Sequence, residues 1–197
     1  MGSHRAGMRL PLSSIVEPHM HKLSWLQGDD WVEHSHPPTF AREQNRIVAG
    51  VPRGDPEIFA RLLTSLEPPY VMLYVLHTPR GEGKPGRYQS PSTALEEVLD
   101  FIRRFEPFLS QDARFDIWGH SPSEQATVVW ERHNLLYAYG PVDEFLRQLS
   151  ALGFSAGKPG IPSPHAHNYR PELDPYARDL LLAFEWSWSE LRPEDEQ

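Results

Sequence analysis

The chain has 197 residues, of which 39 % are hydrophobic and 23 % are charged, and its formal net charge is -8. This balance is ordinary for one globular domain, and the net negative charge disfavours nucleic acid as a partner. No apolar run approaches the ~20 residues that a membrane span needs. Because cysteine is absent, disulfides, thiolate metal sites and cysteine nucleophiles are excluded, which fits a soluble, cytoplasmic protein.

The N-terminal part of the chain shows no sustained hydrophobic period. Its opening letters MGSH are typical of an expression remnant, so residues 1–7 are set apart from the rest. Trp25 and Trp31 are too apolar for a purely solvated tail. We therefore expect an N-terminal arm over residues 1–40 that packs on a single mixed α/β domain over residues 41–197.

The first elements of this domain follow from apolar runs and turn residues. Residues 45–51 are predicted to form a short strand, and residues 55–66 a helix. Asp55 is placed to accept hydrogen bonds from the first free amides, and Pro56 suits a first turn where no N–H is needed. Residues 70–77 are apolar on both alternating faces, which is typical of a central strand covered on both sides.

The middle of the domain is predicted to add a helix, a strand and a hairpin. Residues 93–109 carry an apolar stripe at helical spacing, and Thr93 with Glu96 matches a capping box at the start of that helix. Residues 114–120 form the next expected strand. Residues 126–140 alternate around a polar turn, which predicts a hairpin.

Two further helices are predicted after the hairpin. The first covers residues 142–152 and ends at Gly153, and a proline-rich loop follows over residues 154–173. The last helix begins at Asp174, which we expect to cap it as Asp55 caps the earlier helix. The order β-α-β-α-β-β-β-α-α predicts an α/β to α+β fold, with a single mixed sheet of about five strands and helices packed on it.

One edge of the predicted sheet gathers groups suited to a ligand. A single helix joins the strands at 70–77 and 114–120, so we expect them to run parallel and to end at the same edge, where open α/β sheets bind ligands. Three cations ahead of a helix N-terminus favour a carboxylate or phosphate there, whereas His133 is expected at the opposite end. The candidate ligand-binding residues are His77, Arg80, Lys84, Arg87 and His120.

The glycines of this stretch also match a dinucleotide-binding spacing. Gly81, Gly83 and Gly86 stand as G-x-G-x-x-G, which binds pyrophosphate where a helix follows at once. Pro85 interrupts the motif, and the predicted helix begins well after Gly86. A simple anion site is therefore favoured over a dinucleotide site.

Three His-x-His pairs raise the question of a metal site. They are His19/His21, His34/His36 and His165/His167. On a strand, residues i and i+2 point the same way, so both imidazoles of a pair can reach one metal ion. No pair falls in a predicted strand, and no established metal-binding motif accompanies them. The candidate ligands for a divalent metal are therefore His34, His36, His165 and His167, and because the pairs lie on separate proline-rich segments we expect them not to form one joint site.

The sequence leaves three functions open. It contains no G-x-S-x-G nucleophile motif and no Walker loop, so a non-catalytic binding protein with a protein partner and no cofactor is favoured. The first alternative is an enzyme that uses these histidines and a divalent metal. The second alternative is an enzyme or sensor for a small anionic ligand at the sheet edge.

Overall fold

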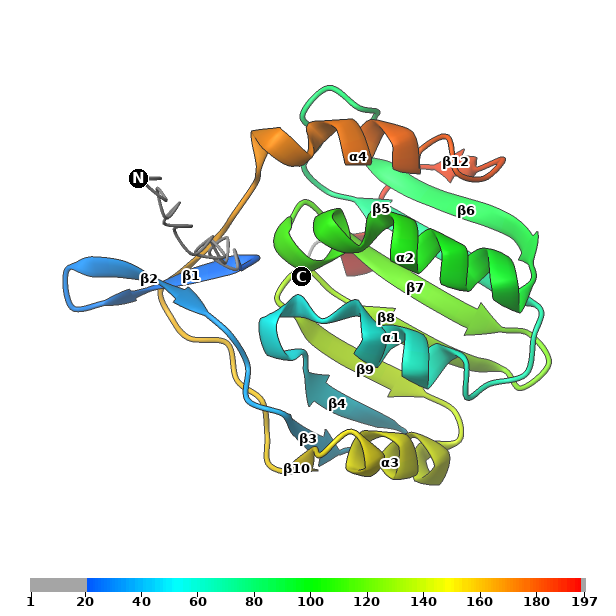
Figure 1. The fold of residues 1–197 in the computed structure, drawn as a ribbon, viewed down its shortest axis with the longest axis horizontal. Coiled ribbons are helices and arrows are strands. Elements are labelled where there is room, and N and C mark those ends of the chain that lie inside the picture. The colour runs from blue at the N-terminus through cyan, green and yellow to red at the C-terminus, as the bar shows by residue number, and fades with distance from the viewer. Residues whose placement is uncertain (1–20, 196–197) are drawn as a thin grey trace, which may run out of the picture.

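The computed structural model describes residues 21–195, which form a mixed α+β fold with two β-sheets (Figure 1). In spatial order, the main sheet consists of β10 (Ser155–Ala156), β3 (Thr39–Arg42), β4 (Arg46–Gly50), β9 (Leu135–Tyr139), β8 (Ala126–Trp130), β7 (Phe115–Ser121), β5 (Tyr70–Leu76), β6 (Gly86–Thr93) and β12 (Ser187–Ser189). The small sheet has the order β11 (His165–His167), β1 (Leu23–Gln27) and β2 (Asp30–His34).

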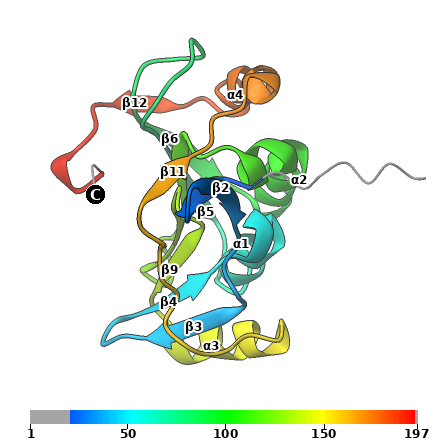
Figure 2. The same cartoon turned by 90° about the vertical axis from the view of Figure 1, so that its left-hand side faces the viewer.

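Helices cover one face of the main sheet (Figures 1 and 2). They are α1 (Pro56–Leu63), α2 (Leu95–Gln111) and α3 (Val142–Ala151), with α4 (Asp174–Leu180) beside α2 and the short helices η1 (Pro52–Gly54) and η2 (Pro171–Leu173). Phe59 of α1 packs against Trp130, and such burial contributes about 1.5–3 kcal/mol per large apolar side chain. The C-terminal segment with η3 (Pro193–Asp195) lies on the opposite face (Figure 2). Within residues 21–195, no helix is long and apolar enough to cross a membrane.

The mixed α+β class is confirmed, but the expected number and order of strands are wrong. The main sheet has nine strands rather than about five, and a second sheet of three strands stands beside it. Most of the additional strands are short, and β10 and β12 have two and three residues. Strands of this length carry no alternating apolar pattern, so the sequence gives little sign of them.

The two expected aspartate caps have different outcomes. Asp55 is confirmed as a cap, because its carboxylate accepts a hydrogen bond from the backbone N–H of Glu57 at 3.0 Å. Asp174 is the first residue of α4 and makes no capping hydrogen bond there. Its carboxylate instead accepts hydrogen bonds from Arg114 at 2.8 Å and from Arg80 at 3.2 Å, so that prediction is wrong.

The predicted capping box of α2 is also wrong, by one residue. Thr93 is the last residue of β6, and the helix begins at Leu95. The backbone N–H of Ala94 donates a hydrogen bond to Glu97 at 2.8 Å, so Glu97 takes the role expected of Glu96. The first turn of α2 therefore still contains a carboxylate, three residues after the cap position, that accepts the backbone N–H of the cap residue.

Strand β6 lies between the predicted strand at 70–77 and the predicted helix at 93–109, where no further strand was expected. Its Pro91 has no N–H for the ladder, and the pairing with β5 shifts register between Val71 and Leu73. At this bulge, the backbone N–H of Met72 donates a hydrogen bond to the hydroxyl of Ser90 at 2.9 Å. The side chain thus replaces a missing backbone partner, which allows a proline-containing segment to remain in the sheet.

The extra strand also changes the direction of β7. Strand β5 is antiparallel to both β6 and β7, because the β5–β6 hairpin adds one reversal of the chain before α2. Val71 lies opposite His120, and Leu76 lies opposite Phe115. His77 follows the last of these positions, so His77 and His120 lie at opposite ends of the sheet. The expected parallel pair is therefore wrong.

The small sheet joins the N-terminal region to a distant part of the chain. Strands β1 and β2 form a hairpin that projects from the main sheet (Figure 1), and β1 also pairs with β11. The expected division between an arm (1–40) and a domain (41–197) stays a prediction, and its boundary falls inside β3. The expectation for residues 1–7 lies outside the described residues.

A buried arginine connects the elements around β11. Arg114 is 0 % exposed, and it forms two hydrogen bonds of 2.8 Å to the carboxylate of Asp112. The same guanidinium donates to Asp174 at 2.8 Å and to Glu82 at 3.1 Å. The second oxygen of Asp112 accepts the backbone N–H of Arg170, a few residues after β11. Burial alone would lower the pKa of Arg114, but the carboxylates outweigh it and raise the pKa above its usual range.

A buried lysine attaches the beginning of β1 to the main sheet. Lys22 is 0 % exposed, and its Nζ lies 4.1 Å from the ring centroid of Trp130 and 4.6 Å from that of Phe115. Among the described residues, Nζ has no hydrogen-bond partner. Burial therefore lowers the pKa of Lys22 to about 7, although the charges of Asp116 and Asp112 partly oppose this effect.

Replacing Arg114 with methionine is expected to destabilise the fold by about 3–5 kcal/mol, because it leaves the buried Asp112 without a cation. Urea titration at neutral pH measures this loss. The matched control is Arg103→Met, because Arg103 pairs with Asp100 on the surface, where both side chains are 70 % exposed. That change is expected to cost less than about 1 kcal/mol. Equal losses in the two variants would contradict the role assigned to Arg114.

Replacing Lys22 with methionine is expected to remove a pH dependence of stability. The pKa of Lys22 falls from 10.5 to about 7 on folding, so between these values the unfolded chain binds more protons. The free energy of unfolding of the wild type therefore rises with pH across this window, by at most about 1.4 kcal/mol per unit. Lys22→Met lacks this contribution. Urea titrations from about pH 7 to about pH 9 test it, and parallel profiles for the two proteins would refute it.

Candidate metal centre and adjoining pocket

Histidines of the small sheet share one of its faces. In β11, His165 and His167 are two residues apart, and His167 and His34 lie on either side of Leu23 in the paired strands. Residues i and i+2 of a strand, and residues paired across strands, point to the same face. The turn between β8 and β9 brings His133 of the main sheet against the β11 pair. Two sheets thus present imidazoles to one another.

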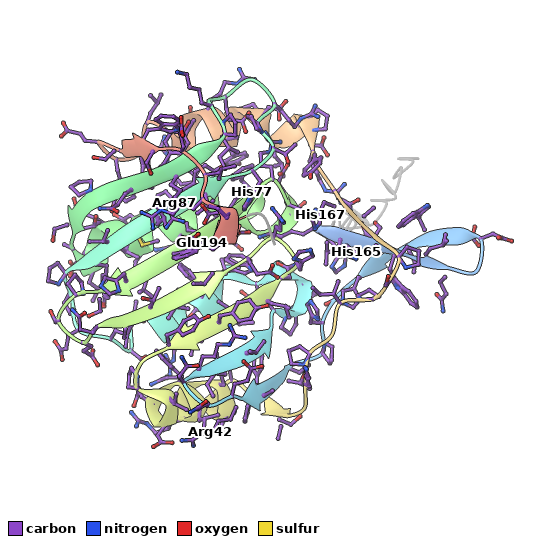
Figure 3. The ribbon with its side chains drawn as sticks, turned by 180° about the vertical axis from the view of Figure 1, so that it is seen from behind. Arg42, His77, Arg87, His165, His167 and Glu194 are labelled. Carbon is purple, nitrogen blue, oxygen red and sulfur yellow. The ribbon has the colours of Figure 1, made fainter. Side chains whose placement is uncertain are left out.

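His133, His165 and His167 form a compact group. The ring centroid of His133 lies 4.6 Å from that of His167 and 5.2 Å from that of His165, and the last two are 5.5 Å apart. One ring nitrogen of each residue lies within 4.8 Å of the others. Figure 3 shows His165 and His167 as neighbours on this edge. Nitrogens that bind one zinc ion each lie about 2.0–2.1 Å from it, so these three rings would have to move closer together to share an ion.

The hydrogen bonds of this group leave the same nitrogen available in each ring. Nδ1 of His133 donates to the carboxylate of Glu131 at 2.6 Å, and Nδ1 of His165 donates to the carbonyl of Pro162 at 3.1 Å. Both rings therefore keep a lone pair on Nε2. Nε2 of His167 is buried and has no hydrogen-bond partner within residues 21–195. Such outer partners are what orients metal-binding histidines in known sites.

Burial keeps His167 and His34 neutral near neutral pH. Burial lowers the pKa of His167 to about 3, and the nearby His133 adds to the effect. Burial and the neighbouring His36 lower the pKa of His34 to about 4. Neutral imidazole is the form that binds metal, so no proton has to leave these rings before an ion binds near neutral pH.

His34 and His36 extend the cluster. Nε2 of His34 and Nδ1 of His36 are 3.4 Å apart, and Nε2 of His36 donates to the backbone carbonyl of His133 at 2.8 Å. His36 is only 2 % exposed. It fits because position 50 is glycine: a Cβ on Gly50 would lie 2.6 Å from the Cβ of His36. The histidines thus form a continuous group from β2 to the β8–β9 turn.

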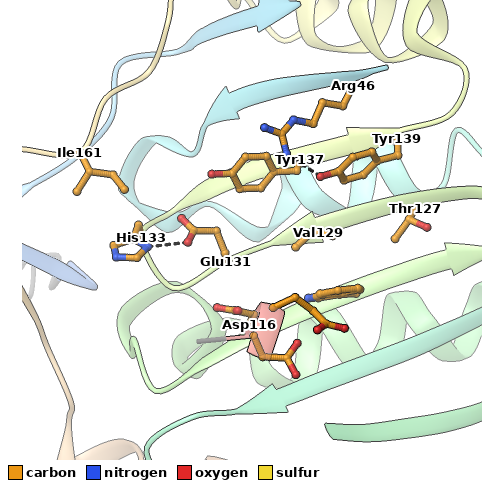
Figure 4. A pocket seen from close by; sticks show the side chains of 12 residues that line it. Arg46, Asp116, Thr127, Val129, Glu131, His133, Tyr137, Tyr139 and Ile161 are labelled. Atoms are coloured by element: carbon orange, nitrogen blue, oxygen red, sulfur yellow. Dashed lines mark hydrogen bonds and ion pairs between the residues drawn. The ribbon is translucent and has the colours of Figure 1, made fainter. Parts of the chain in front are cut away.

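A pocket of about 580 Å³ adjoins this group on the open face of the main sheet (Figure 4). His133 lies at one end of the pocket and therefore belongs to both features. Alternate residues of three neighbouring strands form the floor, namely Asp116 and Trp118 of β7, Thr127 and Val129 of β8, and Tyr137 and Tyr139 of β9. Glu194 and Asp195 of η3 form part of the wall, and Asp195 is held by an ion pair with Arg87 at 2.5 Å.

Several polar groups of the pocket are poised for a ligand. Nε1 of Trp118 and Oε1 of Glu131 are buried, and neither has a hydrogen-bond partner in the described part of the chain. The guanidinium of Arg46 donates to the hydroxyl of Tyr139 at 2.8 Å and lies 4.8 Å from the ring centroid of Tyr137. Buried polar groups are rarely left unpaired in proteins, so the unpaired atoms of Trp118 and Glu131 are suited to form hydrogen bonds with a ligand.

The residues expected at one sheet edge are spread over the structure. His77 donates a hydrogen bond to Asp116 at 2.9 Å, and His120 lies 2.9 Å from the hydroxyl of Thr127. Arg80 and Arg87 form ion pairs with Asp174 and Asp195, respectively. The ammonium group of Lys84 lies over the ring of Trp188. The antiparallel β5–β7 pair separates His77 from His120. The geometric reason for grouping these five residues is therefore removed, and the binding role of each stays a prediction.

The expectation that the histidine pairs form no joint metal site stays a prediction, although His34/His36 and His165/His167 lie near one another in the structure. His165 and His167 form a strand, and His36 and His133 link that strand to His34 through the contacts above. His19 lies outside the described residues. Sequence reasoning missed His133, because its partners are brought to it by long-range pairing. The only local signal was Glu131, two residues earlier, which places a carboxylate beside the imidazole.

Comparisons with known proteins give no assignment. No protein-family model matches the chain, and no curated protein or solved structure matches it.

Proposed function

We propose that the chain is a metal-dependent enzyme whose centre is one divalent transition-metal ion held by Nε2 of His133, His165 and His167. This proposal is supported by the closeness of the three imidazole rings, each of which has a nitrogen available to bind metal. Three histidine ligands that leave the fourth position open are typical of catalytic rather than structural zinc sites. The absence of cysteine in this chain is compatible with such an all-imidazole set.

The pocket lies where a substrate could reach the open fourth coordination position of the ion. His133 is shared by the metal group and the pocket, so a ligand in the pocket would lie beside the ion. An ion held by His133, His165 and His167 would lower the pKa of a bound water to about 7 and would supply it as a nucleophile. The supported reaction class is therefore hydrolysis of a small substrate bound along β8 and β9.

Glu131 is the proposed general base. Its Oε2 accepts the hydrogen bond from His133, whereas its Oε1 is buried and has no partner within the described range. One carboxylate can thus orient a metal ligand with one oxygen and take a proton from water with the other. Asp116 is less suited, because its two oxygens already accept hydrogen bonds from His77 and from the backbone of Arg132.

A non-catalytic binding protein is the second candidate. The observation that favours it is the pocket floor, where Trp118, Tyr137 and Tyr139 offer aromatic surface and an unpaired indole N–H to a ligand. A ligand held by such groups, whether a small molecule or part of a protein partner, needs no chemistry at the metal. Loss of turnover without loss of metal in the Glu131 variant described below separates this function from the enzyme.

The full chain, freed of metal with a chelator and then dialysed against zinc, is expected to retain zinc and to melt at a higher temperature than the metal-free form. The reason is that an ion bound only by the folded state stabilises that state by mass action. Elemental analysis and thermal melting measure the two effects. His167→Gln is expected to reduce the bound zinc by one equivalent, because it removes one of the three converging nitrogens.

The matched control is His120→Gln, since His120 lies on β7 and contacts Thr127 outside the cluster. It is expected to retain zinc as the wild type does. Zinc content that is the same in the wild type and in His167→Gln would contradict the metal centre.

Glu131→Gln is expected to lower the kcat of the zinc-loaded protein on the small ester 4-nitrophenyl acetate by a factor of about 10²–10⁴, the usual contribution of a general base. Glutamine keeps an oxygen that accepts the hydrogen bond from His133, so the variant is expected to retain its zinc. Steady-state kinetics and elemental analysis test both statements. Unchanged kcat, or kcat lost only together with zinc, would refute the role of Glu131 as base.

A further inference from the structure

We propose that His34 and His36 hold a second divalent transition-metal ion, beside the first and independent of it. Nε2 of His34 and Nδ1 of His36 face one another at 3.4 Å, and the two rings are nearly perpendicular, at 88°. This pair goes beyond the proposed function, because none of its atoms belongs to the group formed by His133, His165 and His167.

The hydrogen bond of His36 determines where its lone pair lies. Nε2 of His36 is 2.8 Å from the backbone carbonyl of His133, and a carbonyl oxygen only accepts. The proton of the neutral ring is therefore on Nε2, and Nδ1 carries the lone pair that faces His34. A backbone carbonyl behind a histidine is the usual outer partner of a metal ligand, since it sets the tautomer and the ring orientation.

The distance between the two nitrogens matches a shared ion. Two nitrogens that each lie about 2.0–2.1 Å from a tetrahedral ion are roughly 3.3–3.4 Å apart. The observed separation is 3.4 Å, whereas hydrogen bonds from N–H groups cluster near about 2.9–3.0 Å. The pair is therefore too far apart for a good hydrogen bond and at the right distance for two ligands of one zinc-like ion.

The surroundings hold one ligand firmly and leave the other accessible. His36 is buried at 2 % exposure, and its side chain fits because Gly50 has no Cβ. His34 is only partly buried, at the end of β2, so an ion can approach from solvent. With two protein ligands and water in the remaining positions, this site is expected to bind zinc more weakly than the three-histidine centre.

The two sites can be occupied together. His36 contacts the backbone of His133 and not its ring, so the ring nitrogens of the first centre remain available. The β8–β9 turn supports both ions, through the imidazole of His133 for one and through its carbonyl for the other.

Equilibrium dialysis of the chelator-treated full chain against zinc tests the second site by stoichiometry. The wild type is expected to bind two equivalents, and His34→Gln, His36→Gln and His167→Gln one equivalent each, while the double variant His34→Gln/His167→Gln binds none. The matched control is His120→Gln, which is expected to bind two equivalents because His120 lies outside the cluster. Thermal melting in the presence of chelator checks that each variant is folded, and His34→Gln is expected to melt like the wild type because its side chain is partly exposed.

The outcomes distinguish the second site from the proposed function. One equivalent lost in His34→Gln and in His36→Gln but none in His167→Gln supports the second site and refutes the first. One equivalent in the wild type that disappears in both His34→Gln and His167→Gln indicates a single shared site and overturns the proposal. Two equivalents retained in both His34→Gln and His36→Gln overturn it as well.

Discussion

The buried ion pair between Arg114 and Asp112 is the constraint on which the histidine cluster depends. Neither side chain is exposed, and the pair also holds the backbone N–H of Arg170 and the carboxylate of Asp174. These contacts fix the chain on the C-terminal side of β11, a few residues from His165 and His167. Two charges in such a place are tolerated only when their hydrogen bonds are satisfied, so the geometry of this region admits little variation. A strand of three residues is thereby held in position by polar contacts, because its own pairing is too short to do so.

Several buried polar groups near the histidine cluster have no hydrogen-bond partner among the described residues. Lys22 is buried between two aromatic rings, and His167, Glu131 and Trp118 each bury a polar atom that has no partner among the described residues. Each of these groups makes folding less favourable, yet Glu131 and Trp118 line one pocket, and His167 packs against His133 at the end of that pocket. Sequences lose stability in this way mainly where the polar groups have another task, so the concentration itself favours a binding site there. A metal ion and a polar ligand would satisfy most of these atoms.

Local patterns in the sequence predict the helices and the β8–β9 hairpin, because apolar spacing and turn residues act within a few positions of one another. Asp55 illustrates this, since its carboxylate meets an amide two residues away. Strand β6 could not be found in this way, because Pro91 reads as a loop residue and the bulge at Ser90 exists only beside β5. The histidine cluster is harder still to predict from the sequence. The pairs His34/His36 and His165/His167 are visible in the sequence, but β1 lies between their strands, and His133 comes from a different sheet. Only the long-range pairing places them together.

The position of η3 has a practical consequence for anyone who prepares this protein. Asp195 is part of the pocket wall, where an ion pair with Arg87 holds it. A run of histidines fused close to η3 would therefore lie near the pocket and would offer competing imidazoles to any ion near His133. Purification handles that contain no metal-binding residues, or that are cleaved before metal is measured, avoid an artefact that would otherwise resemble the site itself.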